Sequence, residues 1–233
     1  MRSSKPTVVM KATKKTSRSA TRDPNSVSRL NEYNRKRRFD VTPEPAGKPR
    51  RTRKKTLQFV IQKHRATSLH YDFRLEHDGV MLSWAVPKGP SLDPATKRFA
   101  MQTEDHPIDY NRFEGVIPEG EYGGGTVMIW DHGTWEPEVA DVDAALAKGD
   151  VKFTLHGKKL RGSWVLVRMR QRQWLLIKHR DQAVSNLDIT AIEFRSAVSG
   201  RTLAEIARRD GASARQLKQA EDADRTAAST GAV

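Results

Sequence analysis

The segment 69–76 constrains the fold of this chain more than any other, because its residues alternate between apolar and polar side chains. Alternation with a period of two is typical of a β-strand. Such strands usually bury one face, so we expect the apolar face to be buried and the polar face to be open. The apolar face carries Leu69, Tyr71, Phe73 and Leu75, and the polar face carries His70, Asp72, Arg74 and Glu76.

Two histidines and a carboxylate on this polar face predict a metal site. His64 precedes His70 by six residues, so it shares the face of His70 and Asp72 if the chain stays extended. Such a set suits Mn²⁺, Zn²⁺ or Fe²⁺ with open positions for water and substrate, and spacing alone does not choose among these metals. A merely solvated polar face is the ordinary alternative.

Basic residues near the predicted metal site indicate an anionic substrate. Arg74 follows the ligands on the same face, and the strand-like run 99–106 ends in a further imidazole, His106. Lys88 and Arg98 lie at strand ends, where either residue alone would be an ordinary surface cation. A metal ion, an arginine and an imidazole together stabilise the charge of a phosphoryl transition state. The cluster therefore favours a phosphate as substrate.

Composition limits the classes of protein that the chain can belong to. The 233 residues include no cysteine, which excludes disulfides, thiolate zinc sites and cysteine nucleophiles. The mean hydropathy is −0.71, and no apolar run is long enough to span a bilayer. We therefore expect one substantial domain with tails, in a reducing compartment and without a membrane partner.

The basic charge is concentrated in the first part of the chain. Residues 1–56 contain 18 Lys and Arg but 4 Asp and Glu, whereas residues 57–233 contain 24 of each kind. We expect residues 1–29 to be a disordered basic tail that is attracted to phosphates without sequence preference. An organelle transit peptide or a solubilising tail are the alternatives. Residues 30–56 are expected to form a basic arm with a short helix and three prolines.

The rest of the chain is expected to be mainly β-structure. Residues 57–185 should form one domain of short antiparallel strands, either a small barrel or a sandwich with short peripheral helices. Residues 186–233 should form a partly helical C-terminal extension. The expected strands are 57–64, 69–76, 80–86, 98–104, 126–130, 133–136, 152–156, 162–170 and 173–179, with a hairpin turn at Asp131 and helices at 141–148 and 202–220.

The sequence resembles a known family over about residues 30–185. The run FVIQKHRATSLHYDFRLEHDGVMLSWAVPKGPSLDP at 59–94 and the run beginning EDHPIDYNRFEGVIPEG at 104 resemble the 3′-phosphoesterase domain of bacterial DNA ligase D. The arm YNRKRRFDVTPEPAG and, more loosely, WLLIKHRD at 174–181 are also similar. The Gln-x-His, His-x-Asp-x-Arg, Glu-Asp-His-Pro and Pro-Glu-Gly elements occur in the order of the family.

This resemblance implies a compact antiparallel β-barrel with manganese-dependent end-healing activity, with Zn²⁺ or Co²⁺ as alternative ions. The family trims 3′-terminal ribonucleotides and removes the remaining 3′-phosphate, which leaves a 3′-OH for ligation in non-homologous end joining. The implied partners are DNA ends with a 3′-phosphate or 3′-ribonucleotide, and also an end-joining ligase, a polymerase and Ku-type proteins. The implied location is the bacterial cytoplasm at the nucleoid.

The resemblance also assigns roles to residues. An acidic residue often precedes the arm phenylalanine in the family, and Arg38 stands there in this chain. No Lys-x-Asp-Gly motif occurs, so we expect a stand-alone homologue or an excised domain that does not itself seal nicks. The implied metal ligands are His64, His70 and Asp72; the catalytic residues are Arg74, Lys88, Arg98, His106 and Tyr110; the substrate-binding residues are Gln62, Arg37 and Glu44.

Two other functions use the same residues. A catalytically degenerate DNA-binding repair module would keep the basic arm but would not need the complete set of His64, His70, Asp72, Arg74 and His106. A cupin-like metalloenzyme acting on a small molecule would use similar ligands, but it would need neither the arm nor the cations around the metal.

Overall fold

The computed structural model describes residues 28–48 and 56–230, and strands dominate these residues. The strands pair antiparallel, and the pairing of β1 with β7 closes eight of them into a barrel. This confirms the expected compact antiparallel β-barrel. Most of the predicted tail 1–29, namely residues 1–27, lies outside the described residues. In spatial order the barrel strands are β1 (Leu57–Arg65), β2 (Leu69–His77), β3 (Val80–Val86), β4 (Arg98–Gln102), β10 (Gln173–Lys178), β9 (Arg161–Arg170), β8 (Asp150–Gly157) and β7 (Gly125–Pro137).

The apolar face of each strand points into the barrel and forms one core. Tyr71 of β2 packs edge-on against Trp130 of β7, with ring centroids 5.3 Å apart, and Trp84 packs against Trp174 at 5.8 Å. Burial of aromatic and aliphatic side chains from all eight strands supplies most of the driving force for closing the barrel. The alternation in the sequence therefore predicts the interior face correctly.

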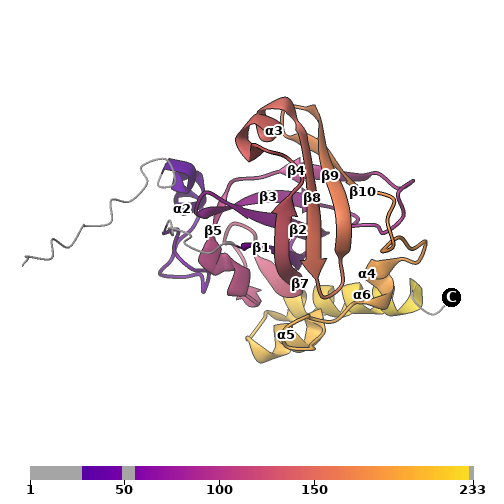
Figure 1. Ribbon diagram of the computed structural model, residues 1–233. Helices are drawn as coiled ribbons and strands as arrows, with labels where there is room; N and C mark the ends of the chain where they lie inside the picture. The colour runs from indigo at the N-terminus through magenta and orange to yellow at the C-terminus, as the bar shows by residue number, and fades with distance from the viewer. Residues whose placement is uncertain (1–27, 49–55, 231–233) are drawn as a thin grey trace, which may run out of the picture.

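The polar face of β2 is also buried, which corrects the expectation of a strand with one open face. Arg74 is 2% exposed and Asp72 is 9% exposed. The arm with helix α2 (Asn31–Arg35) covers this face together with β5 (His106–Pro107) and the 3₁₀ helix η1 (Ile108–Arg112). Figure 1 shows α2 and β5 side by side at one edge of the barrel. Local periodicity does not reveal this cover, because it comes from distant parts of the chain.

Short helices surround the barrel. Helix α3 (Val142–Lys148) confirms the helix expected at 141–148. Asp141 is its N-cap and accepts a hydrogen bond from the backbone N–H of Ala144, and the helix ends at Gly149 with φ of +85°. The predicted helix 202–220 is instead α5 (Leu203–Arg209) and α6 (Ala214–Thr230), separated by a turn that contains a glycine. With α4 (Ile189–Ile192) they gather at one end of the barrel (Figure 1). Among the described residues, no helix has the length and apolarity needed to cross a membrane.

The hairpin predicted at Asp131 is wrong, because β7 continues through this residue. In β1, Ile61 pairs with Asp131 and the next residue, Gln62, pairs with Ile129, so β7 has a bulge at Trp130. Asp131 is fully buried, and its carboxylate accepts hydrogen bonds from the backbone N–H groups of Lys158 and Leu160 at 3.0 and 2.8 Å. Asp131, where the sequence predicted a turn, instead binds the backbone of the turn between β8 and β9. The short strand β6 (Gly115–Ile117) pairs with the first part of β7.

Asp131→Ala should destabilise the protein by about 2–4 kcal/mol, because several backbone donors would lose their acceptor inside the protein. Urea unfolding followed by tryptophan fluorescence measures this change. Asp222→Ala is the matched control, because Asp222 forms an exposed ion pair with Arg225 and should contribute less than about 1 kcal/mol. Equal stabilities of the two variants would contradict the role assigned to Asp131.

Candidate metal and phosphate site

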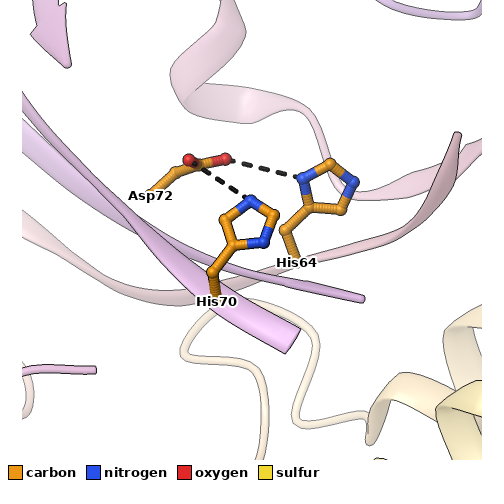
Figure 2. Close-up of side chains that lie close together, drawn as sticks. All are labelled: His64, His70 and Asp72. Atoms are coloured by element: carbon orange, nitrogen blue, oxygen red, sulfur yellow. Dashed lines mark ion pairs between the residues drawn. The ribbon is translucent and has the colours of Figure 1, made fainter. Parts of the chain in front are cut away.

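The three predicted metal ligands lie together at the ends of β1 and β2. His64 is the direct cross-strand neighbour of His70, and Asp72 pairs with Gln62 two residues further along. His64 Nδ1 lies 3.6 Å from Asp72 Oδ2, and His70 Nε2 lies 3.6 Å from Asp72 Oδ1. Figure 2 shows both imidazoles turned toward the carboxylate. Strand pairing therefore brings together the residues that parity in the sequence placed on one face.

The geometry of the three side chains fits one divalent ion. Their ligand atoms all lie within 4.8 Å of one another. Nitrogen and oxygen ligands about 2.0–2.2 Å from a common ion lie about 3–4 Å apart, so small adjustments are enough to close the site. His64 directs Nε2 to the carbonyl of Gly123 at 2.8 Å, and His70 directs Nδ1 to the carbonyl of Ser68 at 3.1 Å. These bonds leave the inward nitrogen of each ring free to bind metal.

Protonation states at the site also suit metal binding. Burial by itself would raise the pKa of Asp72, but Arg74 and the two imidazoles outweigh burial and hold the pKa well below its ordinary value. Burial lowers the pKa of His70, and the charge of Asp72 offsets only part of that effect. An ionised carboxylate and a neutral imidazole are the forms that bind metal.

Arg74 lies beside the metal ligands and is held by three side chains. It donates from Nε to Gln62 Oε1 at 3.0 Å, from Nη1 to Ser83 Oγ at 2.8 Å and from Nη2 to Asp72 Oδ2 at 3.0 Å. Gln62 in turn donates to the carbonyl oxygen of Tyr110 at 3.1 Å. A guanidinium has five N–H groups, so two remain for a bound anion. The structure thus places Gln62 behind Arg74, where it orients the guanidinium.

His106 faces the same cavity as an uncharged ring. Its Nε2 lies 3.2 Å from Nη2 of Arg37, and its Nδ1 lies 2.9 Å from the carbonyl oxygen of Glu104. Because an arginine only donates, Nε2 must accept and Nδ1 must carry the proton. Burial, together with Arg74 and Arg37, lowers the pKa of His106 well below 6.5. The ring is therefore neutral near pH 7.

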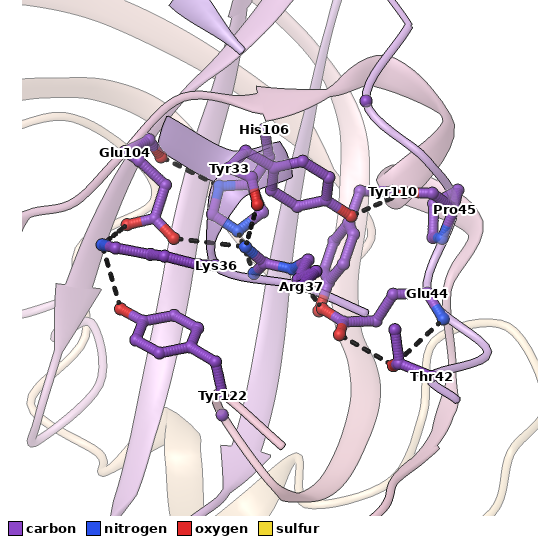
Figure 3. Close-up of polar contacts among 12 residues, drawn as sticks. Tyr33, Lys36, Arg37, Thr42, Glu44, Pro45, Glu104, His106, Tyr110 and Tyr122 are labelled. Atoms are coloured by element: carbon purple, nitrogen blue, oxygen red, sulfur yellow. Dashed lines mark hydrogen bonds and ion pairs between the residues drawn. The ribbon is translucent and has the colours of Figure 1, made fainter. Parts of the chain in front are cut away.

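The arm forms one wall of the site. Glu44 accepts hydrogen bonds at Oε1 from Arg37 Nε at 2.8 Å and from the Tyr110 hydroxyl at 2.9 Å, and at Oε2 from the Thr42 hydroxyl at 2.9 Å. The Arg37 guanidinium also lies over the ring of Tyr33, 3.8 Å from its centroid. Figure 3 shows this network between the arm and the barrel. Burial and the charge of Glu44 raise the pKa of Tyr110 well above its ordinary value, so the phenol stays protonated.

A cavity of about 310 Å³ joins these groups. The lining residues that sequence reasoning missed include Glu104 and Tyr122. Glu104 accepts bonds from Lys36 and Arg37 at 3.0 and 3.3 Å, and the Glu-Asp-His-Pro element was the signal that could have identified it. Tyr122 stands in the glycine-rich loop 119–125. The predicted site residues that line the cavity are Arg37, Glu44, His64, His70, Asp72, Arg74, His106 and Tyr110.

Two predicted catalytic residues do not line this cavity. Lys88 lines a second cavity of about 170 Å³ at the end of the barrel, with Lys63 and Tyr71 among its neighbours. Arg98 begins β4, opposite Leu176 of β10. The catalytic roles of Lys88 and Arg98 stay predictions.

Arg38, which stands where the family often has an acidic residue, lies outside the cavity. The Arg38 side chain is 68% exposed and forms an ion pair with Glu121 of the glycine-rich loop. The basic residue at this position therefore ties the arm to the loop at the rim of the site.

Comparisons with known proteins agree with this geometry. A family model of the DNA ligase D 3′-phosphoesterase domain matches residues 62–168. The chain is 50% identical over 182 residues to the multifunctional non-homologous end joining protein LigD of Pseudomonas aeruginosa, which covers 75% of this chain and 22% of that protein. It is 44% identical over 163 residues to the multifunctional non-homologous end joining DNA repair protein LigD of Mycobacterium tuberculosis, with coverages of 69% and 21%.

The matched region contains most of the site. Residues 62–168 include the three candidate metal ligands together with Arg74 and His106. The chain spans about a fifth of the length of these curated relatives. Through residues 62–168, the chain belongs to the DNA ligase D 3′-phosphoesterase domain family.

Proposed function

We propose that this protein is a metal-dependent phosphoesterase that removes 3′-phosphates and 3′-terminal ribonucleotides from DNA ends and leaves a 3′-OH. One observation carries the proposal. A two-histidine, one-carboxylate cluster shares a cavity with the buried cation Arg74 and with the neutral base His106. This combination suits a tetrahedral phosphate with developing negative charge.

Manganese is the ion that we propose for His64, His70 and Asp72, with Zn²⁺ and Co²⁺ as alternatives. A bound divalent ion would supply Lewis-acid polarisation of a phosphate oxygen and would lower the pKa of a bound water. The surrounding protein groups then bind and orient the substrate. Arg74 offers its two remaining N–H groups to phosphate oxygens, and its three existing bonds keep it from rotating.

Hydrolysis of a phosphate ester requires a proton at the leaving 3′-oxygen and removes one from water. His106 rests with an unprotonated Nε2, so it first acts as an acceptor for a proton from water or from a phosphate hydroxyl. It then donates that proton to the leaving oxygen. Arg37 donates to Nε2 in the resting state, so the substrate must replace this donor before the transfer.

The arm supports removal of ribonucleotides. A carboxylate near a ribose accepts a hydrogen bond from the 2′-OH, which DNA lacks. Glu44 lines the cavity and is held by Arg37 and Tyr110, and both observations support such a role. The exposed pair of Arg38 with Glu121 leaves this inner network intact. We propose that the ribonucleotide step is retained with Arg38 in the arm.

The biological setting is proposed from the relatives. Their names describe multifunctional non-homologous end joining proteins, and one name includes DNA repair. We propose that this chain heals 3′-ends at the bacterial nucleoid so that an end-joining ligase can seal them, with a polymerase and Ku-type proteins as further partners. A duplex with a 3′-phosphate at a recessed end, incubated with Mn²⁺ and resolved on a gel, tests the activity. No 3′-OH product with any of Mn²⁺, Co²⁺ or Zn²⁺ would refute the proposal.

Asp72→Asn should abolish Mn²⁺ binding and lower the rate of phosphate release by at least about 100-fold, because the charged ligand is lost while the shape is retained. Calorimetric titration with Mn²⁺ and the gel assay measure the two effects, and circular dichroism checks the fold. Asp143→Asn is the matched control, because Asp143 belongs to a second, exposed cluster with His77 and Asp78. Retained Mn²⁺ binding in Asp72→Asn would move the metal site elsewhere.

The His106 ring should remain neutral through the physiological pH range. An unperturbed histidine becomes charged as the pH falls through about 6.5. The pKa of His106 is lowered well below that value in the folded protein, so its ring becomes charged only at a more acidic pH. Nuclear magnetic resonance titration of its ring C–H signals, assigned with His106→Gln, should show no midpoint between pH 6 and 8. A midpoint within that range would contradict the resting state assigned to His106.

Glu44→Gln should impair removal of a 3′-ribonucleoside more than removal of a 3′-phosphate, because only the first substrate presents a 2′-OH. The expected change in the ratio of the two rates is on the order of 10-fold. Each rate is measured on matched duplexes, with Asp40→Asn, an exposed residue of the arm, as the control. An unchanged ratio would limit Glu44 to packing of the arm against Tyr110.

A further inference from the structure

An exposed aromatic ring lies at the rim of the cavity. Among the described residues, Phe99 and Tyr122 are the exposed members of the Phe, Trp and Tyr side chains, at 37% and 48%. Tyr122 lines the cavity of the candidate site, whereas Phe99 does not. Single exposed rings are common on protein surfaces, so exposure alone indicates nothing. For Tyr122, its position at the cavity and its contacts with the arm make the exposure relevant to substrate binding.

A tight turn fixes the backbone of Tyr122. The N–H of Gly124 bonds to the carbonyl of Glu121 at 2.9 Å, which makes Tyr122 and Gly123 the central residues of a turn. Gly123 has φ of +78°, a value that favours glycine at the third position of a type II turn. Its carbonyl oxygen lies 2.8 Å from Nε2 of His64. Tyr122 is therefore tied through the next residue to a candidate metal ligand.

The arm holds the Tyr122 ring through cations. Lys36 Nζ lies 4.8 Å from the ring centroid and 3.3 Å from the hydroxyl oxygen, and the Arg37 guanidinium lies 5.5 Å from the centroid. Glu104 binds both cations and fixes them in turn. Figure 3 shows Tyr122 next to Lys36 on the side of the network away from Glu44. The ring thus keeps a fixed position although nearly half of its surface is open.

We propose that Tyr122 forms a nucleobase subsite, on which the base of the 3′-terminal nucleoside stacks while its phosphate occupies the cavity. This inference rests on the proposed function. A phosphate held by Arg74 and the metal ligands carries its nucleoside directly outward, past the rim. Every base presents a π-face, so a tyrosine platform accepts all four bases and suits an enzyme that heals ends of any sequence.

A competing role is that of a latch. The hydroxyl of Tyr122 bonds to Lys36, so the residue could act only by joining the glycine-rich loop to the arm. The two roles respond differently to the substrate. Stacking depends on the terminal base, whereas a latch acts equally on strands with and without that base, so the ratio of the two rates separates them. Tyr122→Phe removes only the hydroxyl contact with Lys36 and keeps the ring, whereas Tyr122→Leu removes the ring.

The experiment compares two 3′-phosphate strands that differ only in the terminal nucleotide, which carries either a normal base or an abasic tetrahydrofuran. The ratio of their kcat/KM values is measured for wild type, Tyr122→Leu, Tyr122→Phe and the control Phe99→Leu. A strand ending in the fluorescent base 2-aminopurine provides a second readout, because stacking quenches its emission. The quenching is measured with chelator present, so it does not depend on turnover.

Wild type should prefer the base-bearing strand by on the order of 10- to 100-fold. Phe99→Leu and Tyr122→Phe should keep this preference and the quenching, and Tyr122→Leu should lose both. The subsite is refuted if wild type shows no preference, or if Tyr122→Leu slows both strands equally, as a latch would. If wild type releases phosphate from neither strand, the proposed function fails, and the quenching in wild type and Tyr122→Leu still decides whether the ring binds a base.

Discussion

The buried guanidinium of Arg74 is the interaction on which the rest of the site depends. Removing a charge from water is costly unless other groups replace its hydration, and Gln62, Ser83 and Asp72 do so on three sides. The same cation keeps Asp72 ionised and helps to keep His106 neutral. One positive charge therefore favours the charged form of a candidate metal ligand and the neutral form of a histidine, two residues that come from separate strands. The anion that would satisfy its remaining donors is the expected substrate.

Local periodicity predicts the antiparallel strands and the cluster of candidate metal ligands, whereas the choice of a barrel over a sandwich came from the resemblance to the family. His64, His70 and Asp72 lie within nine residues on one hairpin, so parity is enough to place them together. The wall formed by the arm depends instead on contacts between residues that are distant in the sequence. Glu44 contacts Tyr110 across 66 residues, and no pattern within a short window predicts such a contact. Here the resemblance to the family supplied the residues, and the structure shows the contacts that join them.

The errors of the sequence analysis have physical causes. Asp131 and its neighbours have the composition of a turn, but the carboxylate is an acceptor for a different turn, and composition does not distinguish the two cases. The polar face of β2 has the pattern of a solvated surface because burial by a distant segment leaves no local trace. In both cases the residue type indicated a polar role, and tertiary contacts determined which groups the side chain meets.

The hairpin of β1 and β2 has a consequence for the order in which the site is assembled. The ligand pair His64 and His70 is separated by six residues, whereas Arg37 reaches His106 across 69 residues. Contacts between near neighbours in a chain form faster than contacts between distant ones. The candidate ligands are therefore expected to meet before the arm closes over them. Under the proposed function, an ion would enter the open hairpin first, and the wall formed later by the arm would retain it.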